Sequence, residues 1–189
     1  MSFASKRLRP RLLGLYALAG LAFWYASPTG TSIALGLAPI AIGEGIRLWA
    51  TGHLHKNDAL TVTGVYAYVR HPLYLGTLLI CAGFLGMAQN GLALVALAGL
   101  ALFFFAYYLP YKDRIESARL ESLYGDEFRR YAAAVPRLLP RLRPYVALGA
   151  SREQLPAWRM ARFADNNELG TAAAVGVGVI AMVVRWQLA

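Results

Sequence analysis

Two short polar stretches of the sequence place charged and aromatic side chains next to long apolar runs. The first is residues 64–76, GVYAYVRHPLYLG, in which Arg70 and His71 come directly before Pro72. Proline is favoured at the first position of a helix, where a backbone N–H has no intrahelical partner. The stretch therefore predicts the start of a helix, with side-chain donors on the loop that leads into it.

The backbone and the aromatic side chains of this stretch suggest a site for a charged, planar molecule. The N–H groups of Leu73 and Tyr74 are expected to point toward the loop without intrahelical partners, and with the helix dipole they would attract an anion. Tyr66, Tyr68 and Tyr74 add flat surfaces for stacking. The alternative is an interfacial anchor, because Arg and Tyr gather at helix ends in membrane proteins. Composition alone favours the anchor.

The second stretch, residues 112–131, has the period of an amphipathic helix. Its apolar stripe consists of Leu120, Leu123, Tyr124 and Phe128. Glu116 lies four residues before Leu120 and therefore on the same stripe. A carboxylate on such a face needs a partner, and groups of this kind are often functional. Lys112, four residues before Glu116, offers the other interpretation, which is a local ion pair without a catalytic role.

Two more groups of polar residues stand within or beside apolar runs. Glu44 and Arg47 are three residues apart and so share one face of a predicted helix. Charges inside a bilayer are costly, so these two are expected to pair with each other or to face a polar cavity. His53 and His55 lack further clustered ligands, so we expect no metal site.

Composition identifies a class of protein. The chain has 189 residues, is 58% hydrophobic and carries a net charge of +9, with a mean hydropathy of +0.44. The basic residues flank apolar runs, which favours membrane orientation over nucleic-acid binding. The single cysteine, Cys81, excludes an intrachain disulfide. We expect an all-α polytopic membrane bundle with a cytoplasmic helical and loop lobe.

Five apolar runs predict about five transmembrane helices. They are residues 12–26, 31–50, 73–89, 92–111 and 169–188. With the N-terminus in the cytoplasm, both short outer turns carry no charge, and Arg185 is the single basic residue that is not inside. This agrees with the positive-inside rule. The prediction is an integral membrane protein whose functional site faces the cytoplasm.

Together, the two polar stretches resemble the family of isoprenylcysteine carboxyl methyltransferases and phospholipid methyltransferases, which are integral membrane enzymes. The resemblance is carried by LTVTGVY at 60–66, RHPLYLG at 70–76, and Glu116 followed by Leu120, Tyr124-Gly125, Phe128, Tyr131 and Val135-Pro136. It runs from about Arg47 to Pro140, roughly half of the chain. We divide the single membrane domain, 1–189, into two N-terminal spans (1–46), a methyltransferase core (47–140) and a polar segment with the last span (141–189).

The resemblance implies a methyltransferase that uses S-adenosyl-L-methionine, with the cofactor entering from the cytoplasm. It implies a set of cofactor-binding residues: Lys56, Leu60, Tyr66, His71, Pro72, Leu73, Tyr74 and Glu116. Catalytic roles are assigned to Arg47, Lys112 and Glu116. Lys112 stands where the family commonly has an arginine, and lysine lacks the planar fork that binds a carboxylate through two hydrogen bonds. Ser117 stands where the family usually has a second glutamate.

The expected partners are a lipid-like or prenylated substrate and the membrane lipids, with no nucleic acid and no metal. O-methylation of an isoprenylcysteine-type carboxylate is favoured, because a carboxylate nucleophile needs no general base whereas an amine must first lose a proton. A phospholipid amine N-methyltransferase is the first alternative. A membrane sterol-type reductase would need a dinucleotide-binding fingerprint, which is not seen. A non-enzymatic lipid-binding or transport protein would need a polar path across the spans.

Overall fold

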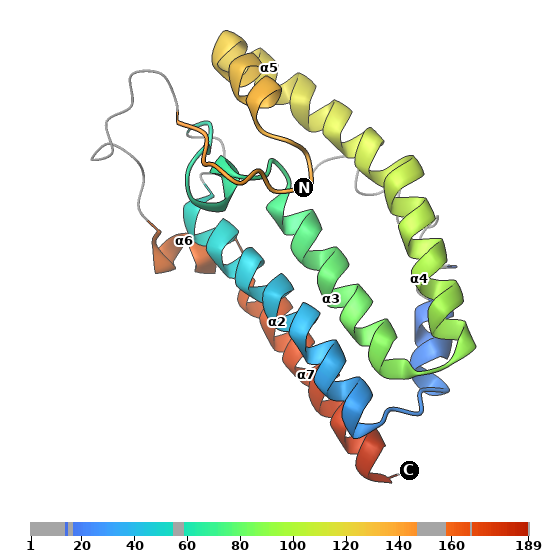
Figure 1. Ribbon diagram of the computed structural model, residues 1–189. Helices are drawn as coiled ribbons and strands as arrows, with labels where there is room; N and C mark the ends of the chain where they lie inside the picture. The colour runs from blue at the N-terminus through green and yellow to red at the C-terminus, as the bar shows by residue number, and fades with distance from the viewer. Residues whose placement is uncertain (1–13, 15–16, 55–58, 147–157, 167, 189) are drawn as a thin grey trace.

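Every regular element in the described part of the chain is helical, which confirms the all-α class (Figure 1). The computed structural model describes residues 14, 17–54, 59–146, 158–166 and 168–188. The α-helices are α2 (Gly30–His53), α3 (Pro72–Ala88), α4 (Gly91–Phe103), α5 (Leu109–Ala134), α6 (Met160–Asp165) and α7 (Glu168–Leu188). A 3-10 helix, η1 (Gly64–Ala67), precedes α3, and a π-helical segment, η2 (Phe104–Tyr108), joins α4 to α5.

Three helical stretches of the described chain are long and apolar enough to cross a bilayer. They are α2, the continuous rod from Gly91 to Ala134, and α7. Helix α3 is apolar but has 17 residues. The span predicted at 12–26 begins outside the described residues, and its residues 17–24 are helical. The number of five spans stays a prediction.

Helices α2 and α3 form the frame of the bundle and approach each other closely through glycines. A Cβ atom on Gly43 would lie 2.6 Å from the carbonyl oxygen of Gly76, and a Cβ on Gly76 equally close to that of Gly43. Gly36 and Gly83 make the same close approach nearer the start of α2 and the end of α3. Small residues allow the backbones of membrane helices to come this near. The pairing fixes the start of α3 against the last turns of α2.

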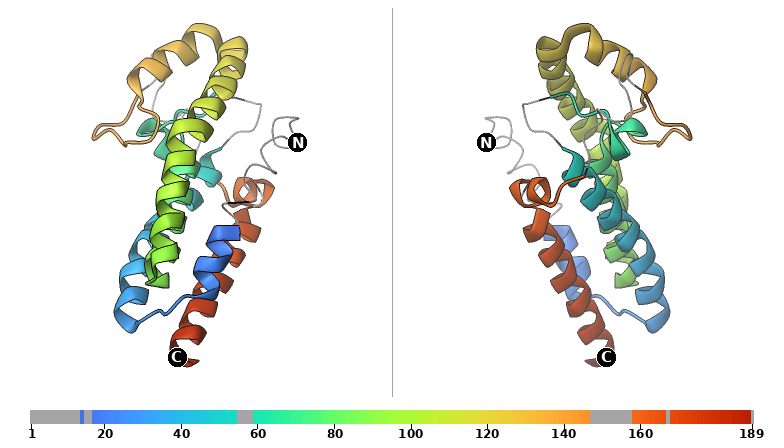
Figure 2. Two further views of the ribbon diagram at one scale, coloured as in Figure 1. Left: turned by 90° about the vertical axis from the view of Figure 1, so that its right-hand side faces the viewer. Right: turned by 90° about the vertical axis from the view of Figure 1, so that its left-hand side faces the viewer.

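The fourth predicted span and the amphipathic helix form one rod. Pro110 near the start of α5 lacks the N–H that a regular helix would use, and the wider turns of η2 come immediately before it. The rod bends at Gly125, whose φ of 50° and ψ of −123° lie outside the helical region. Beyond this bend the last turns of α5 lead back toward η1 (Figure 2).

The segment after α5 is tied to the loop that precedes α3. Its four backbone hydrogen bonds run from Arg70 N to Pro136 O, His71 N to Arg137 O, Arg141 N to Tyr68 O and Tyr145 N to Ala67 O, at 2.8–3.0 Å. The buried Tyr131 hydroxyl donates to the Tyr66 carbonyl at 2.9 Å. These bonds hold one face of α5 over the start of α3. On the other side of the bundle, α7 runs beside α2 and α6 lies against the end of α2 (Figures 1 and 2).

Candidate active site

A cavity of about 360 Å³ lies between the connector that follows α2, the first turn of α3 and one face of α5. Its volume falls within the range of small-molecule sites. The wall includes seven of the eight residues assigned to cofactor binding from the sequence: Leu60, Tyr66, His71, Pro72, Leu73, Tyr74 and Glu116. The predicted apolar stripe of α5 also faces this cavity, through Leu120, Leu123, Tyr124 and Phe128. The fold therefore brings both polar stretches to one place.

Two described residues with assigned roles are not among those that line the cavity. A third assigned residue, Lys56, lies outside the described residues. Lys112 is half-buried on α5, one turn before Glu116, and Arg47 is on α2 beneath Leu73. The catalytic roles of Arg47 and Lys112 stay predictions.

Pro72 begins α3, as predicted. The carbonyl of His71 accepts hydrogen bonds from Tyr74 N at 3.2 Å and from Leu75 N at 3.1 Å. The expectation of a free Tyr74 N–H is therefore wrong, because the first turn closes on the cap residue. The N–H of Leu73 makes no backbone hydrogen bond within the described part of the chain, and it remains the amide that can attract an anion.

Glu116 meets the start of α3 across the cavity. The Tyr74 hydroxyl donates to Glu116 Oε1 at 2.6 Å, and Glu116 Oε2 lies 3.6 Å from His71 Nδ1. The rings of His71 and Tyr74 stack with centroids 5.2 Å apart. No ion pair joins Lys112 to Glu116, although both are described, so the alternative of a local pair is not what the structure has. The Glu116 side chain is 40% exposed, which leaves part of its carboxylate open to a ligand.

Asp113 holds the His71 side of the cavity in place, and the sequence analysis missed it. Its side chain is 8% exposed, and its Oδ1 lies 2.9 Å from His71 Nε2. Its oxygens also lie 3.5 Å from Arg70 Nη1 and 3.0 Å from Arg137 Nε. This carboxylate fixes the ring of His71 and lies within ion-pair distance of two arginines. The spacing of three between Asp113 and Glu116, which puts both on one side of a helix, is the signal that could have found it.

The cavity wall keeps hydrogen-bond donors available. Burial raises the pKa of the Tyr66 hydroxyl above its usual value, and the neighbouring Tyr131 adds to the effect. The hydroxyl therefore stays protonated at neutral pH. The Nε of Arg70 is buried and has no hydrogen-bond partner within the described part of the chain. Donors, a carboxylate and aromatic faces together fit a ligand with an amino acid group and a planar ring.

Comparisons with known proteins give one matching family and relatives with two kinds of name, a metal-resistance protein and isoprenylcysteine O-methyltransferases. Residues 40–127 match the family described as phospholipid methyltransferase. The chain is 34% identical over 142 residues to the cobalt-zinc-cadmium resistance protein CzcN of Cupriavidus metallidurans, a match that covers 71% of this chain. It is 32% identical over 117 residues to protein-S-isoprenylcysteine O-methyltransferase B of Arabidopsis thaliana, covering 56% of this chain. It is 29% identical over 105 residues to protein-S-isoprenylcysteine O-methyltransferase of Schizosaccharomyces pombe, covering 54%.

These matches extend over part of each relative. They cover 63%, 57% and 42% of the three relatives, in the same order. No solved structure matches the chain. The matched family segment contains the described cavity-lining residues from Leu54 to Tyr124, so the cavity is largely a feature of that segment.

Proposed function

We propose that the chain is a member of the family of isoprenylcysteine carboxyl methyltransferases and phospholipid methyltransferases, which its family match and its relatives support, and that it methylates a lipid-like acceptor with S-adenosyl-L-methionine. The observation that carries the proposal is the joint position of His71, Tyr74 and Glu116 in one cavity at the start of α3. Two sequence stretches that are far apart in the chain supply these groups.

The residues of the wall match the parts of this cofactor. Arg70, whose side chain lines the cavity, and the Leu73 N–H offer donors for a carboxylate. Glu116 can accept from an ammonium or a ribose hydroxyl, and the tyrosine rings offer faces for adenine or for a sulfonium. When bound, the cofactor supplies a methyl group on a positively charged sulfur that is open to nucleophilic attack. Transfer then depends mainly on alignment and on exclusion of water.

The side chains of the wall favour an acceptor that needs no general base. His71 is the single histidine among the described residues that line the cavity. Its Nε2 is bonded to Asp113, and its Nδ1 faces Glu116 at 3.6 Å. Asp113 therefore occupies one of the two ring nitrogens. An amine acceptor would first have to lose a proton to a base, whereas a carboxylate needs none, so a carboxylate acceptor of the isoprenylcysteine type is favoured. A phospholipid amine is the second candidate, because the matched family carries that description.

A transfer assay separates these acceptors. Purified protein in lipid nanodiscs is given methyl-labelled S-adenosyl-L-methionine with either a prenylcysteine analogue or a phospholipid amine, and product is counted. The proposal expects label in the prenylcysteine analogue and its loss in Glu116→Gln. Glu121→Gln, an exposed change on the same helix, is the matched control and should behave as wild type. Label in the amine alone would reverse the choice of acceptor, and no label in either would remove the function.

A further inference from the structure

We propose that the C-terminal elements α6 and α7 support the wall of the cofactor site without lining it, with Glu168 as a positioning residue. Through Arg47, Glu168 holds the first turn of α3, whose residues line the cavity. This inference rests on the proposed function. It gives a role to a part of the chain that lies outside the matched family segment, residues 40–127.

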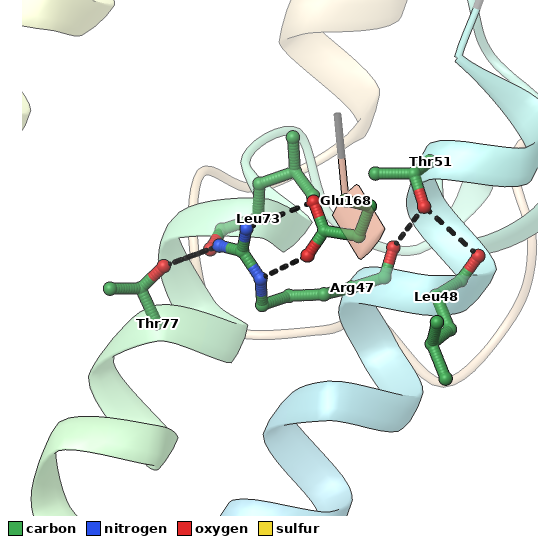
Figure 3. Close-up of polar contacts among 6 residues, drawn as sticks. All are labelled: Arg47, Leu48, Thr51, Leu73, Thr77 and Glu168. Carbon is green, nitrogen blue, oxygen red and sulfur yellow. Dashed lines mark hydrogen bonds and ion pairs between the residues drawn. The ribbon is translucent and has the colours of Figure 1, made fainter. Parts of the chain in front are cut away.

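The guanidinium of Arg47 joins three helices (Figure 3). Its Nε and Nη2 donate to the two carboxylate oxygens of Glu168, at 2.6 and 3.0 Å, so the pair is bidentate. Its Nη1 donates to Thr77 Oγ1 at 2.6 Å and to the Leu73 carbonyl at 3.3 Å. Arg47 comes from α2, Glu168 from the first residue of α7, and Leu73 and Thr77 from α3. One cation therefore connects the C-terminal helix to the turn that begins at Pro72.

The side chains of the Arg47–Glu168 pair are largely buried, and neither residue is among the described residues that line the cavity. The side chains of Arg47 and Glu168 are 14% and 4% exposed. The stem of Arg47 passes so close to α3 that a Cβ on Gly76 would lie 2.5 Å from its Cγ. A buried pair with each charge hydrogen-bonded keeps one geometry, because moving either member leaves an uncompensated charge. Because Arg47 donates to the carbonyl of Leu73, a residue that lines the cavity, the position of the ion pair affects the position of this part of the cavity wall.

A second set of contacts fixes the same C-terminal unit onto α2. The Trp158 indole N–H donates to the Leu48 carbonyl at 3.1 Å. Arg159 N donates to the Gly52 carbonyl and Asn166 Nδ2 to the Thr51 carbonyl, each at 3.0 Å. Trp158, Arg159 and Asn166 therefore bind the backbone of the last turns of α2.

A competing partner for Arg47 shows why Glu168 matters. Glu44 lies three residues before Arg47, and both of its carboxylate oxygens are buried without a hydrogen-bond partner in the described chain. If Glu168 loses its charge, Glu44 becomes the carboxylate that can draw the guanidinium along α2 and away from Leu73 and Thr77. The first turn of α3 then loses its support. Of the two alternatives expected from the sequence, pairing of Glu44 with Arg47 is not what the structure has, because Arg47 pairs with Glu168 instead.

Calorimetric titration with S-adenosylhomocysteine tests this role in the full-length protein in detergent. Glu168→Gln keeps the shape of the side chain and should weaken binding about tenfold, as expected for a small misplacement of binding groups. Thr77→Val removes one acceptor of Arg47 and leaves the ion pair intact, so it should weaken binding about threefold, the scale of one hydrogen bond. In turnover assays the KM for S-adenosyl-L-methionine should rise by the same factors while kcat changes little.

Arg185→Gln is the matched control. Arg185 lies near the far end of α7 and donates to the Ala26 carbonyl, so its loss should lower the melting temperature without changing the affinity. If Glu168→Gln does not fold, Thr77→Val decides. Wild-type affinity in the folded variants would overturn the inference while leaving the proposed function intact. A wild-type protein that binds no S-adenosylhomocysteine would remove both.

Discussion

Glu116 and Glu168 both connect a later helix to the first turn of α3, Glu116 directly and Glu168 through Arg47, but their carboxylates differ in exposure and in hydrogen bonding. The Glu116 side chain is 40% exposed and accepts a hydrogen bond from Tyr74. The Glu168 side chain is 4% exposed, and both of its oxygens are bonded to Arg47. One carboxylate has capacity left for a ligand, and the other is saturated by the protein. The difference separates the group that can bind from the group that supports.

The largest expected effect is on stability, at the buried pair of Arg47 and Glu168. Arg47→Ala leaves Glu168 as an uncompensated buried charge, which should lower the free energy of unfolding by about 3–5 kcal/mol. Denaturant unfolding in detergent micelles, followed by circular dichroism, measures it. Arg47→Lys, which keeps the charge without the fork, should recover part of the loss. If Arg47→Ala is as stable as wild type and yet inactive, Arg47 acts on the ligand directly and is not a supporting residue.

Substitution of Asp113 should have a smaller effect on stability than substitution of Arg47. Asp113 is buried like Glu168, but it contacts the cavity wall as Glu116 does. It is buried, yet its partner His71 lines the cavity. Asp113→Asn removes the charge that faces Arg70 and Arg137 and should cost about 2 kcal/mol of stability, the scale of a hydrogen bond to a charged group. Binding of S-adenosylhomocysteine should weaken as well, because the ring of His71 loses its fixed orientation. Thermal unfolding and calorimetry on one preparation measure both, and a change in neither would show that Asp113 does not position His71.

Substitution of Glu121 should have the smallest effect on stability and activity. Its side chain is 47% exposed and pairs with Arg129, which is 58% exposed. Exposed pairs are screened by solvent, so Glu121→Gln should leave the melting temperature and methyl transfer at wild-type values. A loss of activity in this variant would show that the charge of α5 as a whole, and not the position of Glu116, drives function.

The sequence predicts the parts of this fold that depend on local chemistry. Pro72 begins α3, and Asn90, between the predicted spans 73–89 and 92–111, caps α4 by accepting from Ala93 N. Glu116 was placed on the correct face of its helix by spacing alone. These features follow from proline geometry, capping and helical period, which act within a few residues.

The parts that the sequence does not predict depend on contacts between distant segments. Glu168 lies 121 residues from Arg47, whereas Glu44 is close by on the same helix, so spacing points to the wrong partner. The pairing of residues 67–71 with 136–145 is likewise visible only in the folded chain. The continuous rod from Gly91 to Ala134 differs from the two predicted helices because η2 accommodates Pro110 without a break.

The most direct test of the central claim is calorimetric titration of wild type and Glu116→Gln with S-adenosylhomocysteine, both folded in detergent. The claim is that the cavity between Glu116 and the start of α3 holds the methyl donor. It predicts saturable binding to wild type, and affinity at least about tenfold weaker in the variant, as for a lost charge-assisted hydrogen bond, at an unchanged melting temperature. Equal binding by both proteins, or none by wild type, would contradict it.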